Sequence, residues 1–278
     1  MLSYRHAFHA GNFADVLKHS VLTLVLEHLT KKDKGFTYID THSGAGMYQL
    51  ADEYAQKTGE FKNGIGKLIE QDDLPESLLP YITLINSLND NELNVYPGSP
   101  GIAKQYTRRQ DSSHLFELHP TDIQHLTQYC QRWNKSHVKQ VDGYQGLLGL
   151  LPPPSRRALV LMDPPYELKD DYTKVIKTLA KAYRKFATGT YILWYPVVKR
   201  ELIEQMQQAF IKSDIKNILQ VEFSMTPDTD EYGMTGTGLF IINPPWQLKQ
   251  QLSEIMPYLK NKLGNASSSY QLTQLVDE

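Results

Sequence analysis

Ala158-Leu-Val-Leu-Met-Asp163-Pro-Pro-Tyr166 is the stretch of this sequence that decides the fold class. Its first five residues are all apolar, which is typical of a strand buried on both faces inside a parallel sheet. The two prolines cannot continue the hydrogen-bonded ladder, and they fix the backbone just past the strand. The pattern therefore predicts that Asp163 and Tyr166 lie at the carboxyl edge of a sheet, where open α/β folds place their chemistry.

The tetrapeptide Asp-Pro-Pro-Tyr has two interpretations. Taken by itself, it is more often a turn that ends a strand. It is also the (Asp/Asn)-Pro-Pro-(aromatic) motif of S-adenosylmethionine-dependent enzymes that methylate amino groups on bases. In that interpretation Asp163 accepts N–H bonds from a weakly nucleophilic amine, and Tyr166 offers a flat face to a base taken out of its stack. The cofactor brings an activated methyl group, so no metal is expected.

Three further strands are expected to end at the same edge. Residues 36–40 lead into the small loop 41–46 (Thr-His-Ser-Gly-Ala-Gly), which lets the backbone approach a ligand closely. The next two strands end in Glu117, suited to ribose hydroxyls, and in Asp142, suited to an adenine amino group. The order predicts an α/β, Rossmann-like class I S-adenosylmethionine-dependent methyltransferase. Its seven-stranded sheet is mostly parallel with the last strand antiparallel; a dehydrogenase or structural α/β domain is the alternative.

A second Pro-Pro motif, Asn243-Pro-Pro-Trp246, has to be weighed against the first. Residues 218–225 and 238–243 are expected to pair as a terminal hairpin, because no helical pattern separates them. The second of these strands is the antiparallel one in the predicted fold. Its carboxyl end then falls at the opposite edge of the sheet, so we interpret Asn243 as a strand terminator.

The domain prediction divides the chain into a core, an insertion and a tail. Residues 1–46 and 96–265 form the methyltransferase core. Residues 47–95 show helical patterns where such a core would normally place its second strand, which predicts an inserted helical subdomain. Residues 266–278 are rich in Ser and Gln and are expected to be a loose C-terminal tail.

Two helix starts follow from capping patterns. Asn12, with Asp15 three residues later, is typical of an N-cap. That helix is expected to place Lys18 and His19 on the flank opposite its apolar stripe. Ser99 is expected to cap a second helix.

Composition limits the possible partners. With 278 residues, 41% apolar and 22% charged, the chain is ordinary for a globular protein. A net charge of −2 excludes a bulk electrostatic nucleic-acid binder, so RNA contacts must come from local basic clusters. Four adjacent cation pairs are candidates, although such pairs are usually just solvated: Lys31-Lys32, Arg108-Arg109, Arg156-Arg157 and Lys199-Arg200.

The single cysteine, Cys130, excludes an internal disulfide and a multi-cysteine zinc site. No signal peptide is recognised, and no apolar run is long enough to span a membrane. A cytoplasmic protein is therefore expected.

The motifs together resemble the large-subunit ribosomal RNA methyltransferase J family over nearly the whole length. They are MLSYRHAFHAGN, YIDTHSGAG, YPGSP, FELHP, VDG, LMDPPYE, LWYPV and INPPW. The resemblance implies methylation of adenine 2030 of 23S ribosomal RNA at N6. S-adenosyl-L-methionine is then the cofactor, S-adenosyl-L-homocysteine the product and 23S ribosomal RNA the partner of an expected monomer.

Carried over position by position, the resemblance also implies roles for residues. Asp163 becomes the catalytic proton acceptor, and Tyr4 contacts the RNA near the target base. We expect Tyr4 and His6 to fold over the active site when substrate binds. The residues implied at the cofactor site are Lys18, His19, His42, Ser99, Glu117, Asp142, Gly143 and Asp163.

Three other functions are less favoured. A DNA adenine-N6 methyltransferase usually carries a target-recognition domain, for which residues 47–95 are short. A protein glutamine methyltransferase more often has Asn at the first motif position, where this chain has Asp163. A non-catalytic nucleic-acid-binding factor on the same scaffold would not need Asp163 and Glu117.

Overall fold

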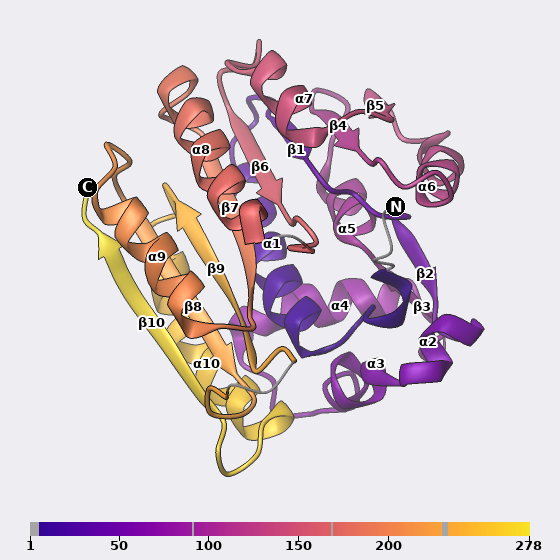
Figure 1. Ribbon diagram of the computed structural model, residues 1–278. Coiled ribbons are helices and arrows are strands. Elements are labelled where there is room, and N and C mark those ends of the chain that lie inside the picture. Colours follow the sequence, from indigo (N-terminus) through magenta and orange to yellow (C-terminus); the bar gives the residue numbers. More distant parts are fainter. Residues whose placement is uncertain (1–5, 91, 168, 230–232) are drawn as a thin grey trace.

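The computed structural model describes residues 6–90, 92–167, 169–229 and 233–278. In these ranges the chain forms one eight-stranded sheet with helices on both faces (Figure 1). In spatial order the strands are β10 (Ser269–Val276), β8 (Ile218–Ser224), β9 (Gly236–Ile242), β7 (Thr190–Val197), β6 (Ala158–Met162), β1 (Thr37–Asp40), β4 (Ser112–Phe116) and β5 (Ser136–Lys139). No helix among the described residues is long and apolar enough to cross a membrane.

Strand directions confirm the predicted fold class. The pairs β5–β4, β4–β1, β1–β6 and β6–β7 are parallel. Strand β9 lies between β7 and β8 and pairs antiparallel with both, so β8–β9 is the predicted hairpin. The described sheet has eight strands where seven were predicted, because β10 forms an additional strand at its edge, next to β8.

Strand β10 corrects the prediction of a loose tail over residues 266–278. It pairs antiparallel with β8, from Ser269 opposite Ser224 to Val276 opposite Ile218. Much of it is exposed, since it lies at the sheet edge, and its Ser, Gln and Thr side chains hide the strand in the sequence. The end of the chain is therefore part of the sheet.

Side chains of the sheet alternate between two apolar layers. In β6, Leu159 and Leu161 join one layer, while Val160 and Met162 join the other. Helices α1 (Phe13–Thr30), α5 (Ser99–Tyr106), α6 (Asp122–Cys130) and α10 (Leu248–Leu263) cover the first layer. Helices α7 (Gly143–Leu150), α8 (Lys169–Lys185) and α9 (Arg200–Ile211) cover the second (Figure 1). This arrangement leaves the carboxyl ends of the parallel strands at one edge.

Residues 47–95 pack against α1. Strands β2 (Met47–Gln49) and β3 (Val95–Pro97) pair antiparallel at the two ends of the segment. Between them lie α2 (Glu53–Thr58), α3 (Glu60–Asn63), η2 (Ile65–Lys67), η3 (Glu76–Leu78) and α4 (Leu79–Ser87); the short helix η1 (His6–Phe8) precedes α1. Their buried side chains belong to the same apolar cluster as those of α1. We propose that residues 47–95 are the inserted helical subdomain that the sequence predicts.

The two capping predictions have different outcomes. The Asn12 side chain accepts hydrogen bonds from the backbone N–H groups of Ala14 and Asp15, so it caps α1 as predicted. Ser99 is not a cap: Gly98 holds that position, and Ser99 is the first helical residue. The Ser99 hydroxyl is engaged elsewhere, by a buried carboxylate in the site described next.

Candidate active site

A cavity of about 230 Å³ opens at the carboxyl ends of β1, β4 and β6. Loop 41–46 follows β1, Glu117 follows β4, and Asp163 follows β6, so the parallel sheet brings them together. Most predicted site residues line this cavity: His6, Lys18, His19, His42, Ser99, Glu117, Asp142, Gly143 and Asp163. The topology thus collects side chains from strands that are far apart in sequence.

Tyr166 lies beside the cavity. Its ring centroid is 4.4 Å from that of Tyr172 and 5.9 Å from that of Trp194, and its hydroxyl donates to the Trp194 carbonyl at 2.7 Å. Trp194 itself is among the lining residues. Residue-by-residue reasoning missed this tryptophan, although it lies in the LWYPV motif. Tyr4 lies outside the described residues.

Ion pairs join α1 to the end of β6. The Lys18 ammonium lies 2.6 Å from Oδ2 of Asp163 and 2.8 Å from Oδ1 of Asp15. The other oxygen of Asp15 contacts Nε2 of His6 at 2.9 Å and accepts from the Gly11 N–H at 2.9 Å. Lys18 and Asp15 are both buried. One lysine therefore fixes the carboxylate of Asp163 and is itself fixed by a second carboxylate.

Electrostatics keep this network charged. Burial lowers the pKa of Lys18, but the carboxylates of Asp15 and Asp163 more than offset it and raise that pKa above its ordinary value. Burial raises the pKa of Asp15, but its contacts with His6 and Lys18 hold it well below its usual range. The ammonium and the Asp15 carboxylate therefore stay ionised near neutral pH.

His19 is directed toward the insertion. Its Nδ1 lies 2.7 Å from the hydroxyl of Tyr96 in β3, which lies 2.8 Å from the hydroxyl of Tyr81 in α4. Burial lowers the pKa of His19 to about 3, so its ring is neutral. The flank of α1 opposite its apolar stripe is therefore buried too, because its polar side chains lie against other parts of the protein and not in solvent.

A buried carboxylate lies beneath the loop after β1. Asp40 accepts from the hydroxyls of Tyr38 at 2.8 Å and Ser99 at 2.7 Å. Burial raises the pKa of Asp40 to about 6 despite these bonds. The neighbouring His42 stacks edge-on against Tyr144, and burial lowers its pKa to about 4. These contacts fix the loop that faces the cavity.

Glu117 and Asp142 also hold neighbouring backbone segments in place by accepting hydrogen bonds from their N–H groups. Glu117 accepts from the N–H groups of Gly44 at 2.8 Å and His119 at 2.7 Å, and burial raises its pKa. Asp142 caps α7 through one oxygen, and its other oxygen lies 3.1 Å from the Lys174 ammonium. Burial raises the pKa of Asp142, but these contacts bring it below its ordinary value.

Gly143 allows a close approach of two segments at the cavity. A Cβ atom on Gly143 would lie 1.9 Å from the carbonyl oxygen of Thr41. A larger residue would therefore push the start of α7 away from the loop after β1. The position requires glycine for steric reasons.

The second Pro-Pro motif lies at the other edge of the sheet. Strand β9 runs antiparallel to β7, so its carboxyl end is remote from Asp163. The Asn243 amide donates to the carbonyls of Ala187 and Gly189, both at 2.7 Å. Asn243 does not belong to the lining of the cavity.

Substitution of Asn243 is expected to leave the chemistry intact. Asn243→Ala removes two hydrogen bonds and puts alanine at φ +50°, which costs roughly 1–3 kcal/mol of stability. Turnover of the folded variant should stay within about threefold of the parent, measured beside an Asp163→Ala control. A much larger loss of turnover in a folded Asn243→Ala protein would mean that the wrong Pro-Pro motif has been assigned.

Comparisons with known proteins agree on one family. Residues 33–276 match the family model described as Ribosomal RNA large subunit methyltransferase D, RlmJ. The chain is 49% identical over 271 residues to Ribosomal RNA large subunit methyltransferase J of Escherichia coli (strain K12), covering 97% of both. Identity to the protein of that name from Haemophilus influenzae is 50%, covering 95% of this chain and 94% of the relative. The crystal structure of protein LPL1258 from Legionella pneumophila is similar at TM-score 0.89 and 40% identity, covering 96% and 98% of the two chains.

Proposed function

This chain belongs to the RlmJ family of large-subunit ribosomal RNA methyltransferases, and we propose that it methylates the N6 amino group of an adenine in 23S ribosomal RNA. S-adenosylmethionine is the methyl donor in this proposal. Adenine 2030 is the target that the family resemblance implies. Action on ribosomal RNA supports the cytoplasm as its location.

One observation carries the proposal: Glu117, Asp142 and Asp163 follow three strands and line one cavity. The residues fit the cofactor. Glu117 and Asp142 supply carboxylate acceptors for hydroxyl and amino groups. Gly143 has no side chain to meet Thr41, so the start of α7 and the loop after β1 approach each other closely at the cavity.

Asp163 is the proposed catalytic residue. The amine of adenine is a poor nucleophile because its lone pair is delocalised into the ring. Asp163 accepts one N–H bond, and the backbone carbonyl at Pro164 can accept the other, which favours a pyramidal nitrogen. Asp163 then takes the proton that the methylated nitrogen releases. Bound S-adenosylmethionine supplies a methyl group already activated by the sulfonium.

Lys18 positions this carboxylate. Its ammonium contacts Oδ2 of Asp163 at 2.6 Å, which leaves Oδ1 to face the amine. His6 holds Asp15 from the other side at 2.9 Å, so the N-terminal segment and the catalytic carboxylate belong to one network.

Transfer of a labelled methyl group tests the proposal. Tritiated S-adenosylmethionine is supplied with naked 23S ribosomal RNA, ribosomal particles or genomic DNA, and the products are digested to nucleosides. The expected result is N6-methyladenosine from RNA and no label in DNA. Label in DNA would favour a DNA adenine methyltransferase, and no label in any substrate would favour a non-catalytic binding factor.

Glu117 is predicted to act on the cofactor. Glu117→Ala should weaken S-adenosylmethionine binding by about 1–3 kcal/mol, because charge-assisted hydrogen bonds are lost. Glu117→Gln keeps one acceptor and should show a smaller loss. Calorimetry gives both affinities; an unchanged affinity in Glu117→Ala would remove this residue from the proposed cofactor site.

A further inference from the structure

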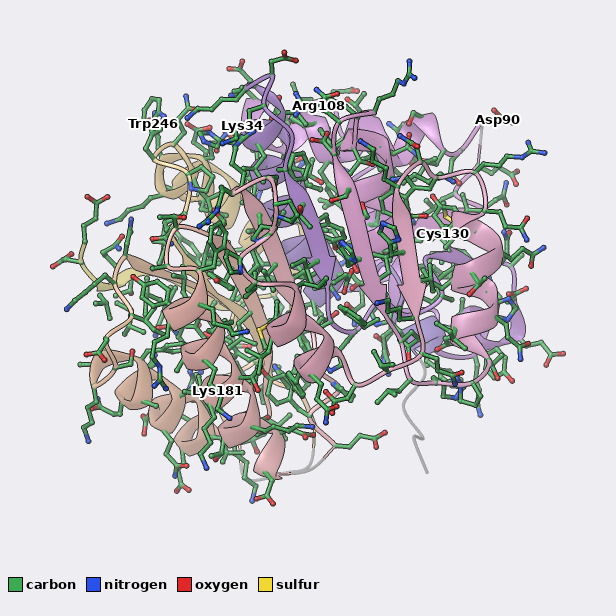
Figure 2. The ribbon with its side chains drawn as sticks, turned by 90° about the horizontal axis from the view of Figure 1, so that it is seen from above. Lys34, Asp90, Arg108, Cys130, Lys181 and Trp246 are labelled. Carbon is green, nitrogen blue, oxygen red and sulfur yellow. The ribbon has the colours of Figure 1, made fainter. Side chains whose placement is uncertain are left out.

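Three of the four adjacent cation pairs in the sequence lie at the amino ends of the parallel strands, on the side of the sheet opposite the active site. They come from the loops 31–36, 107–111 and 151–157, each of which precedes a parallel strand, β1, β4 or β6. Figure 2 shows Lys34 and Arg108 close together at the top of the view, with Lys181 of α8 well below them. We call the set the basic edge: Lys31, Lys32, Lys34, Arg108, Arg109, Arg156 and Arg157.

Hydrogen bonds hold the three loops together. The Arg108 guanidinium donates to the carbonyls of Thr30 at 3.0 Å and Lys32 at 2.8 Å. The Arg157 guanidinium donates to the Leu29 carbonyl at 2.8 Å. These two arginines fix the loops, and the lysines of the first loop remain exposed. The loops of the basic edge are therefore fixed relative to one another and form one surface.

The charge of this surface is strongly segregated. The three loops contain seven cations and two carboxylates, Asp33 and Asp111, so their net charge is +5. Asp111 is buried and paired with Arg108. Because the whole chain carries −2, the remainder carries a net −7. Such a patch on an otherwise acidic protein attracts polyanions to one place.

The fourth pair behaves differently and serves as a comparison. The Arg200 guanidinium lies 2.8 Å from Glu222 and 2.8 Å from Asp228, so internal carboxylates neutralise it. Stabilisation of the C-terminus of α1 explains its C-cap Lys31 and the two arginines that donate to its last carbonyls, Arg108 and Arg157. It does not explain the other cations, which are exposed: Lys32, Lys34, Arg109 and Arg156.

An exposed aromatic ring adds to the basic edge. Trp246 is 79% exposed, and Figure 2 shows it at the same edge as Lys34. The next residue, Gln247, lines a groove together with Lys31. Exposed aromatic rings beside cations stack on unpaired bases while the cations contact phosphates.

We propose that the basic edge binds the phosphate backbone of a second segment of the RNA substrate. Asp163 follows Arg157 by six residue steps of extended chain, so the edge lies about 20 Å from the catalytic carboxylate. A structured RNA reaches that far, since one double-stranded-RNA domain already spans about 16 bp. The inference rests on the proposed function for the identity of the RNA.

The test is a lysine triple variant, Lys31→Gln/Lys32→Gln/Lys34→Gln, which spares the two loop-holding arginines. Its matched control removes the same charge from exposed lysines of α8 and its neighbourhood: Lys177→Gln/Lys181→Gln/Lys212→Gln. Binding is measured on a long 23S ribosomal RNA fragment, on ribosomal particles and on a short hairpin around the target adenine, across a series of salt concentrations. Methyl transfer to both RNAs is measured in parallel.

For the lysine triple variant we expect an affinity for the long fragment lower by roughly tenfold and a log–log salt slope smaller by about 2–3. Binding and methylation of the short hairpin should not change, nor should the control variant on either RNA. Unchanged salt slopes on the long fragment would overturn the proposal. So would an equal loss in the control, or weaker binding to ribosomal particles without weaker binding to naked RNA, which indicates a protein partner.

The result is separable from the proposed function. If the chain methylates DNA or nothing, the salt slopes still report whether the basic edge contacts RNA. If the basic edge does not bind RNA, methylation of the short hairpin is unaffected. Each hypothesis therefore fails by its own measurement.

Discussion

Replacing Asp163 by alanine should lower methyl transfer to RNA by a factor on the order of 10² or more, without unfolding the protein. The loss is large because Asp163 is proposed both to accept an N–H bond from the amine and to take its proton. The fold should survive because Lys18 keeps its second partner, Asp15, at 2.8 Å. Turnover is measured at saturating cofactor and RNA, and circular dichroism checks the fold.

The variant Asp163→Asn separates the two roles of the carboxylate. An amide oxygen still accepts a hydrogen bond, but it does not take a proton at neutral pH. If positioning of the amine dominates, Asp163→Asn should retain much more activity than Asp163→Ala. If proton transfer dominates, both variants should be equally slow. Near-parental turnover by a folded Asp163→Ala protein would exclude Asp163 from the chemistry.

The fold was predictable where the sequence pattern has a direct physical cause. Five apolar residues before Asp163 form a strand buried on both faces, and the prolines end it as expected. The antiparallel direction of β9 followed from the hairpin pattern, which placed Asn243 at the far edge. The strand at residues 269–276 was not predicted, because an edge strand buries too little apolar surface to produce a clear hydrophobic pattern in the sequence.

The site was less predictable because its central contacts are non-local. Asp15 looked like part of a cap, yet its carboxylate joins His6 to Lys18 inside the protein. Ser99 looked like a cap, yet its hydroxyl donates to buried Asp40. Short polar side chains can serve the backbone beside them or a group far along the chain, and local sequence does not distinguish the two.

Lys18 is where the structure adds most to the prediction. The sequence placed it on the helix flank, and only the family resemblance brought it to the site. In the structure Lys18 is 3% exposed, and its ammonium lies between two carboxylates, Asp15 and Asp163. Loss of this charge leaves two anions close together with no cation between them. Breaking a buried ion pair by removing one partner costs about 3–5 kcal/mol.

Lys18→Met keeps most of the side-chain volume and removes the charge, so it isolates this effect. We expect the melting temperature to fall by roughly 10 °C at neutral pH. The control Lys104→Met removes a lysine whose ammonium contacts a carbonyl, that of Tyr129, at 3.2 Å, and should cost about 1 kcal/mol. Methyl transfer by Lys18→Met should also fall, because Asp163 loses its positioning contact.

The pH dependence distinguishes charge from packing in Lys18→Met. In the parent, the depressed pKa of Asp15 contributes stability above its unfolded value of 3.8, and this stability is lost as pH falls through the folded value. Without Lys18, Asp15 loses much of what depresses its pKa, so that contribution shrinks at neutral pH. The gap in melting temperature between parent and variant should therefore be widest at neutral pH and narrow on acidification below about pH 4. A gap that stays constant with pH would show that Lys18 acts through packing and not through its charge.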